Sequence, residues 1–185
     1  MWLQGGPGCS SSIGNFYELG PWHVEEDLCL HPNPYPWNHR FGLLFLDNPV
    51  GVGFSIAPSL EDIPSDQDHV ARDVYVALEG FYERFPEFQD RPFYVTGESY
   101  AGKYVPSIAT HILRKQEEKK KMVHLHTYGG HLSHHRHIGS SSNSSLPLRL
   151  DGIAIGNGLT HPIVQVYIII SHYCFVAHLL HWLNW

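Results

Sequence analysis

Cysteine and charge are both scarce in this sequence. Its three cysteines, Cys9, Cys29 and Cys174, are an odd number and form no CxxC pair, so their spacing does not suggest a zinc ribbon and leaves the disulfide state open. Charged residues make up 16% of the chain, the formal net charge is −6, and no basic face with interleaved aromatic residues occurs. This balance argues against nucleic acid or anionic lipid as the main partner.

A leader segment is not visible either. The chain runs from Met1 directly into a glycine turn, without the basic and apolar segments of a signal peptide. What is present is the composition of a globular protein, with 43% apolar residues in a chain of 185. That length is enough for one domain with a sizeable core.

Short apolar runs and helical patterns alternate in the first part of the chain. Residues 43–47 predict a buried parallel strand before a Pro/Gly turn. Ser65 and Asp68 have the spacing of a capping box and predict the start of a helix, which Pro86 ends. The apolar stripe between them comprises Val70, Val74, Leu78, Phe81 and Phe85.

A second strand–helix pair follows the first. Residues 93–96 predict a strand and residues 101–115 predict a helix with a kink at Pro106, after a turn over residues 97–102. Residues 152–156 predict a further strand. This alternation indicates an α/β fold, a mostly parallel sheet flanked by helices, which we expect to be incomplete at both ends.

Changes in amino-acid composition divide the chain into four regions. We expect residues 1–115 and 146–165 to belong to one α/β domain, residues 116–145 to be a disordered His/Ser-rich insertion, and residues 166–185 to be an atypical apolar tail. The insertion cannot bury enough apolar surface to order itself. Its histidines are His124, His126, His131, His134, His135 and His137.

We expect neither a metal site in the insertion nor a membrane span in the tail. The histidines have no fixed helical spacing and no neighbouring carboxylate or cysteine, so we expect no metal and no cofactor. Asn143 fits the glycosylation acceptor pattern. The tail is as long as a membrane span, but His172, His178, His181 and Asn184 make insertion costly, and we favour an unpacked end.

Ser99 stands in the sequence Gly97-Glu98-Ser99-Tyr100-Ala101-Gly102, between a predicted strand and a predicted helix. This is typical of a nucleophile elbow, in which small residues allow a sharp turn that lifts the hydroxyl clear of the sheet. The N–H of Tyr100 would then point at a developing oxyanion. Ala101 stands where the strict GxSxG pattern has its second glycine, and an ordinary turn is the alternative.

A glycine-rich turn lies about ninety residues before this serine. Hydrolases of this class take a second oxyanion donor from such a turn, and Gly6 suits the role because a backbone without Cβ can approach a substrate carbonyl closely. A phosphate loop is the alternative, but the turn lacks the P-loop lysine, and Pro7 removes one N–H.

Five ordered motifs together resemble the serine carboxypeptidase family, with its plant members closest. They are WLQGGPGCSS at 2–11, ELGP at 18–21, DNPVGVGFS at 47–55, GESYAGKYVP at 97–106 and GNG at 156–158. The resemblance covers residues 2–115 and 146–165. It implies Ser99 as the nucleophile and the N–H groups of Gly6 and Tyr100 as the oxyanion hole.

The resemblance also implies a site for the substrate's terminal carboxylate. The implied residues are Trp2, Gln4, Gly5, Glu18 and Glu98. Two carboxyls held close together cannot both ionise, so one keeps its proton and can donate a hydrogen bond to that carboxylate, best at acidic pH. Gln4 stands where many members have asparagine, which puts the amide donor on a longer arm.

A serine hydrolase of this fold needs an acid and a base after the serine, in the order Ser, Asp, His. Asp151 is the sole later aspartate, but it stands at the entry to the 152–156 strand, roughly 16 Å from the catalytic edge at ~3.3 Å per residue. His161 follows the GNG loop, yet nothing in the sequence orients it. In the family, both groups come from later strands, so we expect a truncated product that is inactive alone.

The resemblance therefore implies a serine-type carboxypeptidase that releases C-terminal residues from peptides through an acyl-enzyme on Ser99. A carboxypeptidase-like acyltransferase and a non-catalytic peptide-binding or non-functional fragment are the alternatives. The implied partner is a peptide substrate, with the oligomeric state left open. The implied location is the secretory pathway, vacuolar or extracellular.

Overall fold

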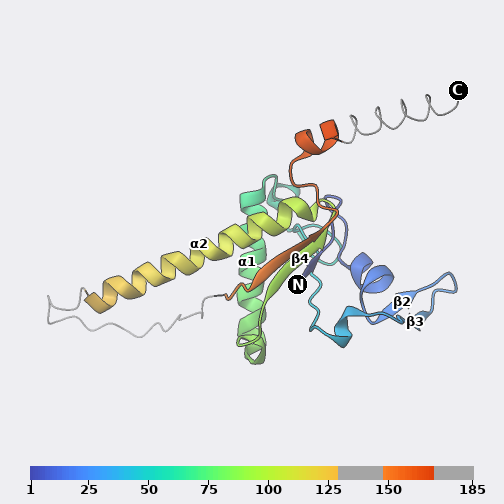
Figure 1. Cartoon of the computed structure of the whole chain (residues 1–185), viewed down its shortest axis with the longest axis horizontal. Coiled ribbons are helices and arrows are strands. Elements are labelled where there is room, and N and C mark those ends of the chain that lie inside the picture. The colour runs from blue at the N-terminus through green and yellow to red at the C-terminus, as the bar shows by residue number, and fades with distance from the viewer. Residues whose placement is uncertain (129–147, 169–185) are drawn as a thin grey trace, which may run out of the picture.

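A computed structural model describes residues 1–128 and 148–168 of the chain (Figure 1). Its centre is a parallel sheet of three strands, β1 (Trp2–Leu3), β4 (Tyr94–Glu98) and β5 (Gly152–Gly156), in the order β1-β4-β5. The predicted strands at 93–96 and 152–156 are confirmed as β4 and β5. Leu3, Gly97 and Ile155 lie side by side across the three strands, so all three end at one edge.

The predicted strand at 43–47 is only partly formed. Phe45 makes a single parallel bridge to Trp2, supported by hydrogen bonds from Trp2 N to Leu44 O and from Leu46 N to Trp2 O. Residues 43–47 are half-buried, and the prediction of a buried strand was wrong. The physical reason is that β1 has two residues, so a neighbouring segment finds few backbone groups with which to form strand hydrogen bonds.

Helix α1 (Gln67–Arg84) is confirmed, with one correction at its start. The predicted Ser65–Asp68 capping box is wrong, because Asp66 is the N-cap and its Oδ1 accepts the N–H of His69 at 2.8 Å. The helix ends at Phe85, before Pro86, as predicted.

Helix α2 (Ala101–Tyr128) is longer than predicted. It includes Pro106 and continues past Lys115, so the expectations that the helix ends there and that the following residues are disordered are wrong as far as Tyr128. Arg, Lys, Gln and Glu fill residues 114–121 and have high helix propensity. Lys115 Nζ also pairs with Glu118 Oε2 at 3.0 Å, one turn along the helix. Figure 1 shows this half of α2 projecting beyond the sheet.

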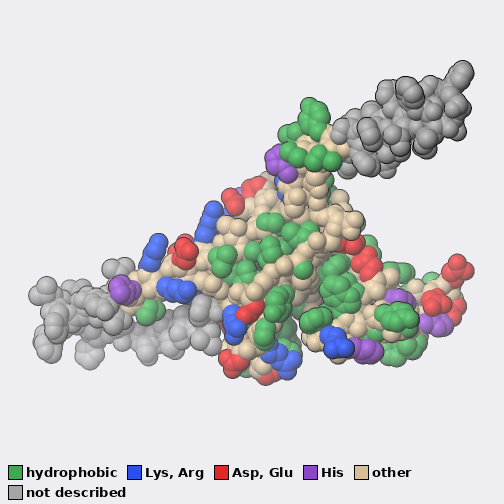
Figure 2. Space-filling view, in the orientation of Figure 1, with side chains coloured by type: hydrophobic (Ala, Val, Ile, Leu, Met, Phe, Trp, Pro, Cys, Tyr) green, Lys and Arg blue, Asp and Glu red, His purple; other side chains and the backbone are tan. Residues whose placement is uncertain are grey.

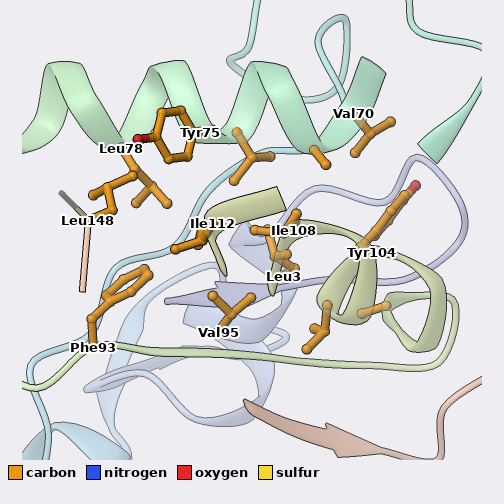
Figure 3. Close-up of a cluster of buried hydrophobic side chains, with 14 residues drawn as sticks. Leu3, Val70, Tyr75, Leu78, Phe93, Val95, Tyr104, Ile108, Ile112 and Leu148 are labelled. Carbon is orange, nitrogen blue, oxygen red and sulfur yellow. The ribbon is translucent and has the colours of Figure 1, made fainter. Parts of the chain in front are cut away.

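The core lies between the sheet and the two long helices (Figure 3). α2 contacts all three strands, and α1 packs against α2. Leu3 and Val95 come from the sheet, Ile108 and Ile112 from α2, and all four side chains are fully buried. The buried stripe of α1 comprises Val70, Ala71, Val74, Tyr75 and Leu78.

Smaller elements surround this centre. An antiparallel hairpin, β2 (Trp22–Val24) and β3 (Leu30–Pro32), extends from the opposite side of the molecule to α2 (Figure 1). The short helical turns are η1 (Gly14–Glu18), η2 (Trp37–His39), η3 (Leu60–Asp62) and η4 (Pro86–Phe88). Residues 162–168 are also helical.

The described surface mixes charged and apolar side chains (Figure 2). Lys and Arg side chains lie along the projecting half of α2, where residues 114, 115 and 119–121 are all basic. Within the described residues, no helix is both long and apolar enough to cross a membrane. Asn143, most of the predicted insertion and most of the tail lie outside the described residues, so those predictions stay untested.

Candidate active site

Ser99 occupies the turn between β4 and α2. Its φ of +56° is in the left-handed region, which costs a non-glycine residue on the order of 1–3 kcal/mol. Three backbone hydrogen bonds hold it there: Ser99 N donates to Gly156 O at 3.0 Å, while Gly102 N and Leu159 N donate to Ser99 O at 3.0 and 2.7 Å. The side chain is exposed. This is the strained strand–turn–helix geometry that the sequence predicted.

Small residues around Ser99 allow this turn to pack. A Cβ at Gly97 would collide with Leu3 O on β1 and lie 2.6 Å from the Cβ of Ala101. A Cβ at Gly102 would lie 2.6 Å from Leu159 N, because the GNG loop crosses there. Ala101, the departure from GxSxG, is fully buried and tolerated.

The glycine-rich turn lies directly against the serine turn. A Cβ at Gly5 would lie 2.7 Å from Tyr100 N and 2.8 Å from Ser99 Cβ, closer than real Cβ atoms approach. Gly6 has a φ of +111°, and Cys9 N closes the turn by donating to Gly5 O at 3.1 Å. In the part of the chain that the structure describes, the N–H groups of Gly6 and Tyr100 donate no backbone hydrogen bond.

Asp47 fixes the far end of this glycine turn, and sequence reasoning gave it no role. Its Oδ1 accepts Ser10 Oγ at 2.6 Å and Ser11 N at 2.8 Å, and its Oδ2 accepts Phe54 N at 2.8 Å. The sequence did contain a signal for Asp47. It is an acidic residue directly after an apolar run, at the carboxyl end of a predicted strand. Asp47 thus joins the turn to the 47–55 loop.

Gln4 is the centre of a polar network beside Ser99. Its Oε1 accepts Trp2 Nε1 at 3.0 Å, and its Nε2 donates to Glu98 Oε1 at 2.7 Å and to Glu18 Oε1 at 3.2 Å. Gln4 is 6% exposed, and Trp2 is buried against the ring of Trp37. Four of the five predicted carboxylate-binding residues therefore meet through one amide. The fifth, Gly5, follows Gln4 in the chain.

The pKa of Glu18 reflects its surroundings in this network. Desolvation raises the pKa of Glu18 first, and the neighbouring charge of Glu98 raises it further, while the hydrogen bond from Gln4 opposes the shift. A carboxyl with a raised pKa keeps its proton to higher pH and can then donate a hydrogen bond. The network therefore combines an amide donor with a carboxyl that is able to donate.

Neither candidate partner of Ser99 bonds to it. Asp151 lies at the opposite end of β5, where its Oδ2 accepts Phe93 N and its Oδ1 pairs with Arg149. The Phe93 N–H is the main cause that lowers the pKa of Asp151. His161 uses its Nδ1 to accept Val164 N at 3.3 Å, at the start of the helical residues 162–168. Both have structural roles.

The described residues contain no group of three or more His, Cys, Asp or Glu side chains able to hold a metal ion. Cys9 and Cys29 are free thiols. The histidines from His131 to His137 and Cys174 lie outside the described residues.

The strand β4, the strained serine and the helix α2 define an α/β-hydrolase type of domain. The serine carboxypeptidase family model matches residues 1–181, and the chain belongs to this family. The resemblance stated from the motifs is confirmed.

Individual relatives agree with this membership. "Serine carboxypeptidase-like 50" of Arabidopsis thaliana is 51% identical over 167 residues, which are 90% of this chain and 32% of that protein. "Probable serine carboxypeptidase CPVL" of Homo sapiens is 41% identical over 88% of this chain and 29% of its own length. The chain therefore spans about a third of the curated relatives that it matches.

A solved structure agrees with the fold. The crystal structure of Kex1(delta)p, a prohormone-processing carboxypeptidase from Saccharomyces cerevisiae, is 32% identical with a TM-score of 0.66. The alignment covers 87% of this chain and 30% of that structure. The predicted α/β-hydrolase fold, present here in part, is confirmed.

Proposed function

We propose that Ser99 is the nucleophile of a serine-type carboxypeptidase that releases C-terminal residues from peptides. The contact between Gly5 and Ser99 carries the proposal, because it sets the serine beside both the glycine turn and the Gln4 network. A hydroxyl that can attack a carbonyl and a site that can bind a terminal carboxylate are then adjacent. That adjacency restricts cleavage to the last peptide bond.

The chemistry assigned to these residues proceeds through an acyl-enzyme. Ser99 Oγ attacks the carbonyl carbon and gives up its proton, the C–N bond breaks, and the leaving amine takes a proton. The N–H groups of Gly6 and Tyr100, which have no backbone acceptor in the described structure, would donate to the oxyanion. Water then hydrolyses the ester and restores the serine.

The base that takes the serine proton and the acid that orients it are not among the described contacts of Ser99. We therefore propose that the 185-residue chain by itself binds peptides and does not turn them over at a useful rate. Without its base, a serine hydrolase keeps only the residual catalysis of its oxyanion hole and binding.

Recognition of the terminal carboxylate is assigned to Gln4, Glu18 and Glu98, supported by Trp2 and Gly5. Protonated Glu18 would donate one hydrogen bond to the substrate carboxylate, and the Gln4 amide would supply another by exchanging one of its present acceptors. A peptide amide lacks the negative charge that these donors match.

The test compares two ligands on the same protein. We expect an N-blocked dipeptide acid to bind at acidic pH at least about tenfold more tightly than its C-terminal amide, because a charged acceptor is lost. Isothermal titration calorimetry measures both. Ser99→Ala should keep this preference, and equal affinities for acid and amide would refute the carboxylate site.

A second measurement tests the nucleophile. A fluorophosphonate probe reacts with a serine whose oxyanion hole stabilises the adduct. In this chain we expect slow labelling, sustained by the residual catalysis that remains without the base, and Ser99→Ala should abolish it. Labelling that survives in Ser99→Ala places the reactive group elsewhere.

We further propose a secretory location, vacuolar or extracellular. Support comes from the acceptor sequence at Asn143 and from a relative named "Venom serine carboxypeptidase" in Apis mellifera, which is 41% identical over 90% of this chain. Expression through the secretory pathway should give a glycan that N-glycosidase removes and that Asn143→Gln lacks.

A further inference from the structure

Asp47 makes contacts that connect it to the oxyanion turn rather than to the fold in general. Its two carboxylate oxygens accept three hydrogen bonds, from Ser10 Oγ, Ser11 N and Phe54 N, at 2.6–2.8 Å. Hydrogen bonds to an ionised carboxylate are short and about twice as strong as neutral ones. Two of the three come from the residues that directly follow the glycine turn.

The turn has two ends, and different parts of the fold hold them. Upstream, Trp2 and Leu3 of β1 pair with Thr96 and Gly97 of β4. Downstream, the carboxylate of Asp47 holds Ser10 and Ser11. Between these anchors, the hydrogen bond of Cys9 N to Gly5 O and the positive φ of Gly6 set the direction of the Gly6 N–H.

The downstream anchor also connects to the network around Gln4. Ser11 is fully buried, its Oγ donates to Leu46 O at 2.6 Å, and it accepts Gln4 N at 3.1 Å. Gly53, with a φ of +54°, lets the 47–55 loop approach, because a Cβ there would collide with the Asp47 carboxylate. The backbone on both sides of Asp47 is therefore shaped around its side chain.

Resting on the proposed function, we propose that Asp47 is a positioning residue for the oxyanion hole: its carboxylate fixes the downstream end of the glycine turn and so aims the Gly6 N–H at the substrate carbonyl. Asp47 does not touch the reacting atoms in this assignment. It acts through Ser10 and Ser11.

The first experiment measures the turn directly, independently of activity. Amide hydrogen exchange of the full chain by NMR is compared for the wild type and Asp47→Ala. We expect exchange of the Cys9 N–H, which closes the turn and does not touch Asp47, to become more than about tenfold faster, because the turn loses its downstream anchor. The amides of Ile153 and Ile155 on β5 should keep their rates.

This comparison separates positioning from general stability. A purely structural role would raise exchange on β5 as much as at Cys9, and that result would overturn the proposal, as would unchanged exchange at Cys9. Should Asp47→Ala fail to fold, Ser10→Ala replaces it, because this variant removes one of the three donors to the Asp47 carboxylate. Its exchange rates at Cys9 and on β5 are judged in the same way. Asp62→Asn is the matched control, since its carboxylate accepts Ser59 N and Ser59 Oγ and no residue of the glycine turn.

The second experiment measures reactivity. We expect fluorophosphonate labelling of Ser99 to be about 100-fold slower in Asp47→Ala, as for a displacement of about 1 Å in a reacting group, with Asp47→Glu recovering part of the rate. Labelling at the wild-type rate would overturn the proposal. A wild type that labels no faster than Ser99→Ala would instead refute the proposed function, and the exchange rates would still decide the role of Asp47.

Discussion

The Cα of Gly5 faces Ser99 so closely that a Cβ on it would lie 2.8 Å from the Cβ of the serine. The same atom would lie 2.7 Å from Tyr100 N and 2.9 Å from Glu98 O. Gly5 therefore packs against three consecutive residues of the serine turn, through the backbone of Glu98 and Tyr100 and the Cβ of Ser99. The glycine is required by close approach, since its φ is not in the left-handed region.

Gly5→Ala should separate the two turns. We expect it to lower the free energy of unfolding by about 1–3 kcal/mol, as overpacking of a tight contact does, and to slow fluorophosphonate labelling of Ser99. Chemical denaturation and labelling kinetics measure the two effects.

Gly80→Ala is the matched control for this substitution. Gly80 lies inside α1, and a Cβ there meets no atom within 4 Å. Replacing a helical glycine by alanine should raise the free energy of unfolding by about 0.5–1 kcal/mol and leave labelling unchanged. A Gly5→Ala protein that behaves like Gly80→Ala would contradict the packing argument.

Binding of a peptide carboxylate should depend on pH through Glu18. Because burial and Glu98 raise the pKa of Glu18, its protonated form persists above the usual range of a glutamic acid. The contribution of this donor is complete below the ordinary pKa and is lost as pH rises through the raised one. Affinity for a blocked dipeptide acid should therefore fall across that interval.

Glu18→Gln provides the control for the pH dependence. The amide keeps a donor at every pH, so the fall in affinity should flatten in this variant. Calorimetric titrations between pH 4 and 8 measure both proteins. A pH profile of Glu18→Gln that coincides with the wild type would assign the titration to another group.

The start of α1 should depend on Asp66 and not on Ser65. Asp66→Ala removes the acceptor of the His69 N–H and should lower the melting temperature, whereas Ser65→Ala should not. The hydrogen bond from the His69 backbone is the main cause that lowers the pKa of Asp66, so the benefit should be lost as pH falls through that lowered pKa. Thermal melts of both variants at neutral and acidic pH measure this.

Local patterns predicted the parts of the fold that local forces determine. The stripe of α1 as far as Leu78 and the strands at 93–96 and 152–156 follow from periodicity and from the residues that interrupt it. The prediction that Phe85 continues the stripe was wrong, because α1 ends at Arg84 and Phe85 is exposed. The Asp66 cap was missed because Ser65 and Asp66 are both good caps, and the choice depends on the entry path of the chain. The extension of α2 was not predicted, because the polar composition after residue 115 is typical of disorder, whereas the helix propensity of residues 114–121 favours a helix.

The site divides in the same way. The turns at Ser99 and at residues 5–9 could be predicted from short motifs, because the small residues within each motif determine the local backbone conformation. The network around Gln4 was predicted through the family resemblance, because the hydrogen bonds between Gln4, Glu18 and Glu98 join separate segments. The position of Asp47 directly after an apolar run could have marked it as a candidate. The loop that its carboxylate bonds could not be predicted, because the sequence alone does not show which segments meet in the fold.

The pairing of β1 with β4 has a consequence for how this site comes into being. Met1 N donates to Tyr94 O across a separation of 93 residues, and Gln4 bonds Glu98 across 94. At 5–20 residues per second, a ribosome needs roughly 5–20 s to synthesise the chain between those two side chains. During that interval, the glycine turn exists without its serine, and closing so long a loop is a slow, entropically costly step. The hydrogen-bonded geometry at Ser99 also cannot be complete before residue 159 has been synthesised, because Gly156 O and Leu159 N hold the backbone of the serine.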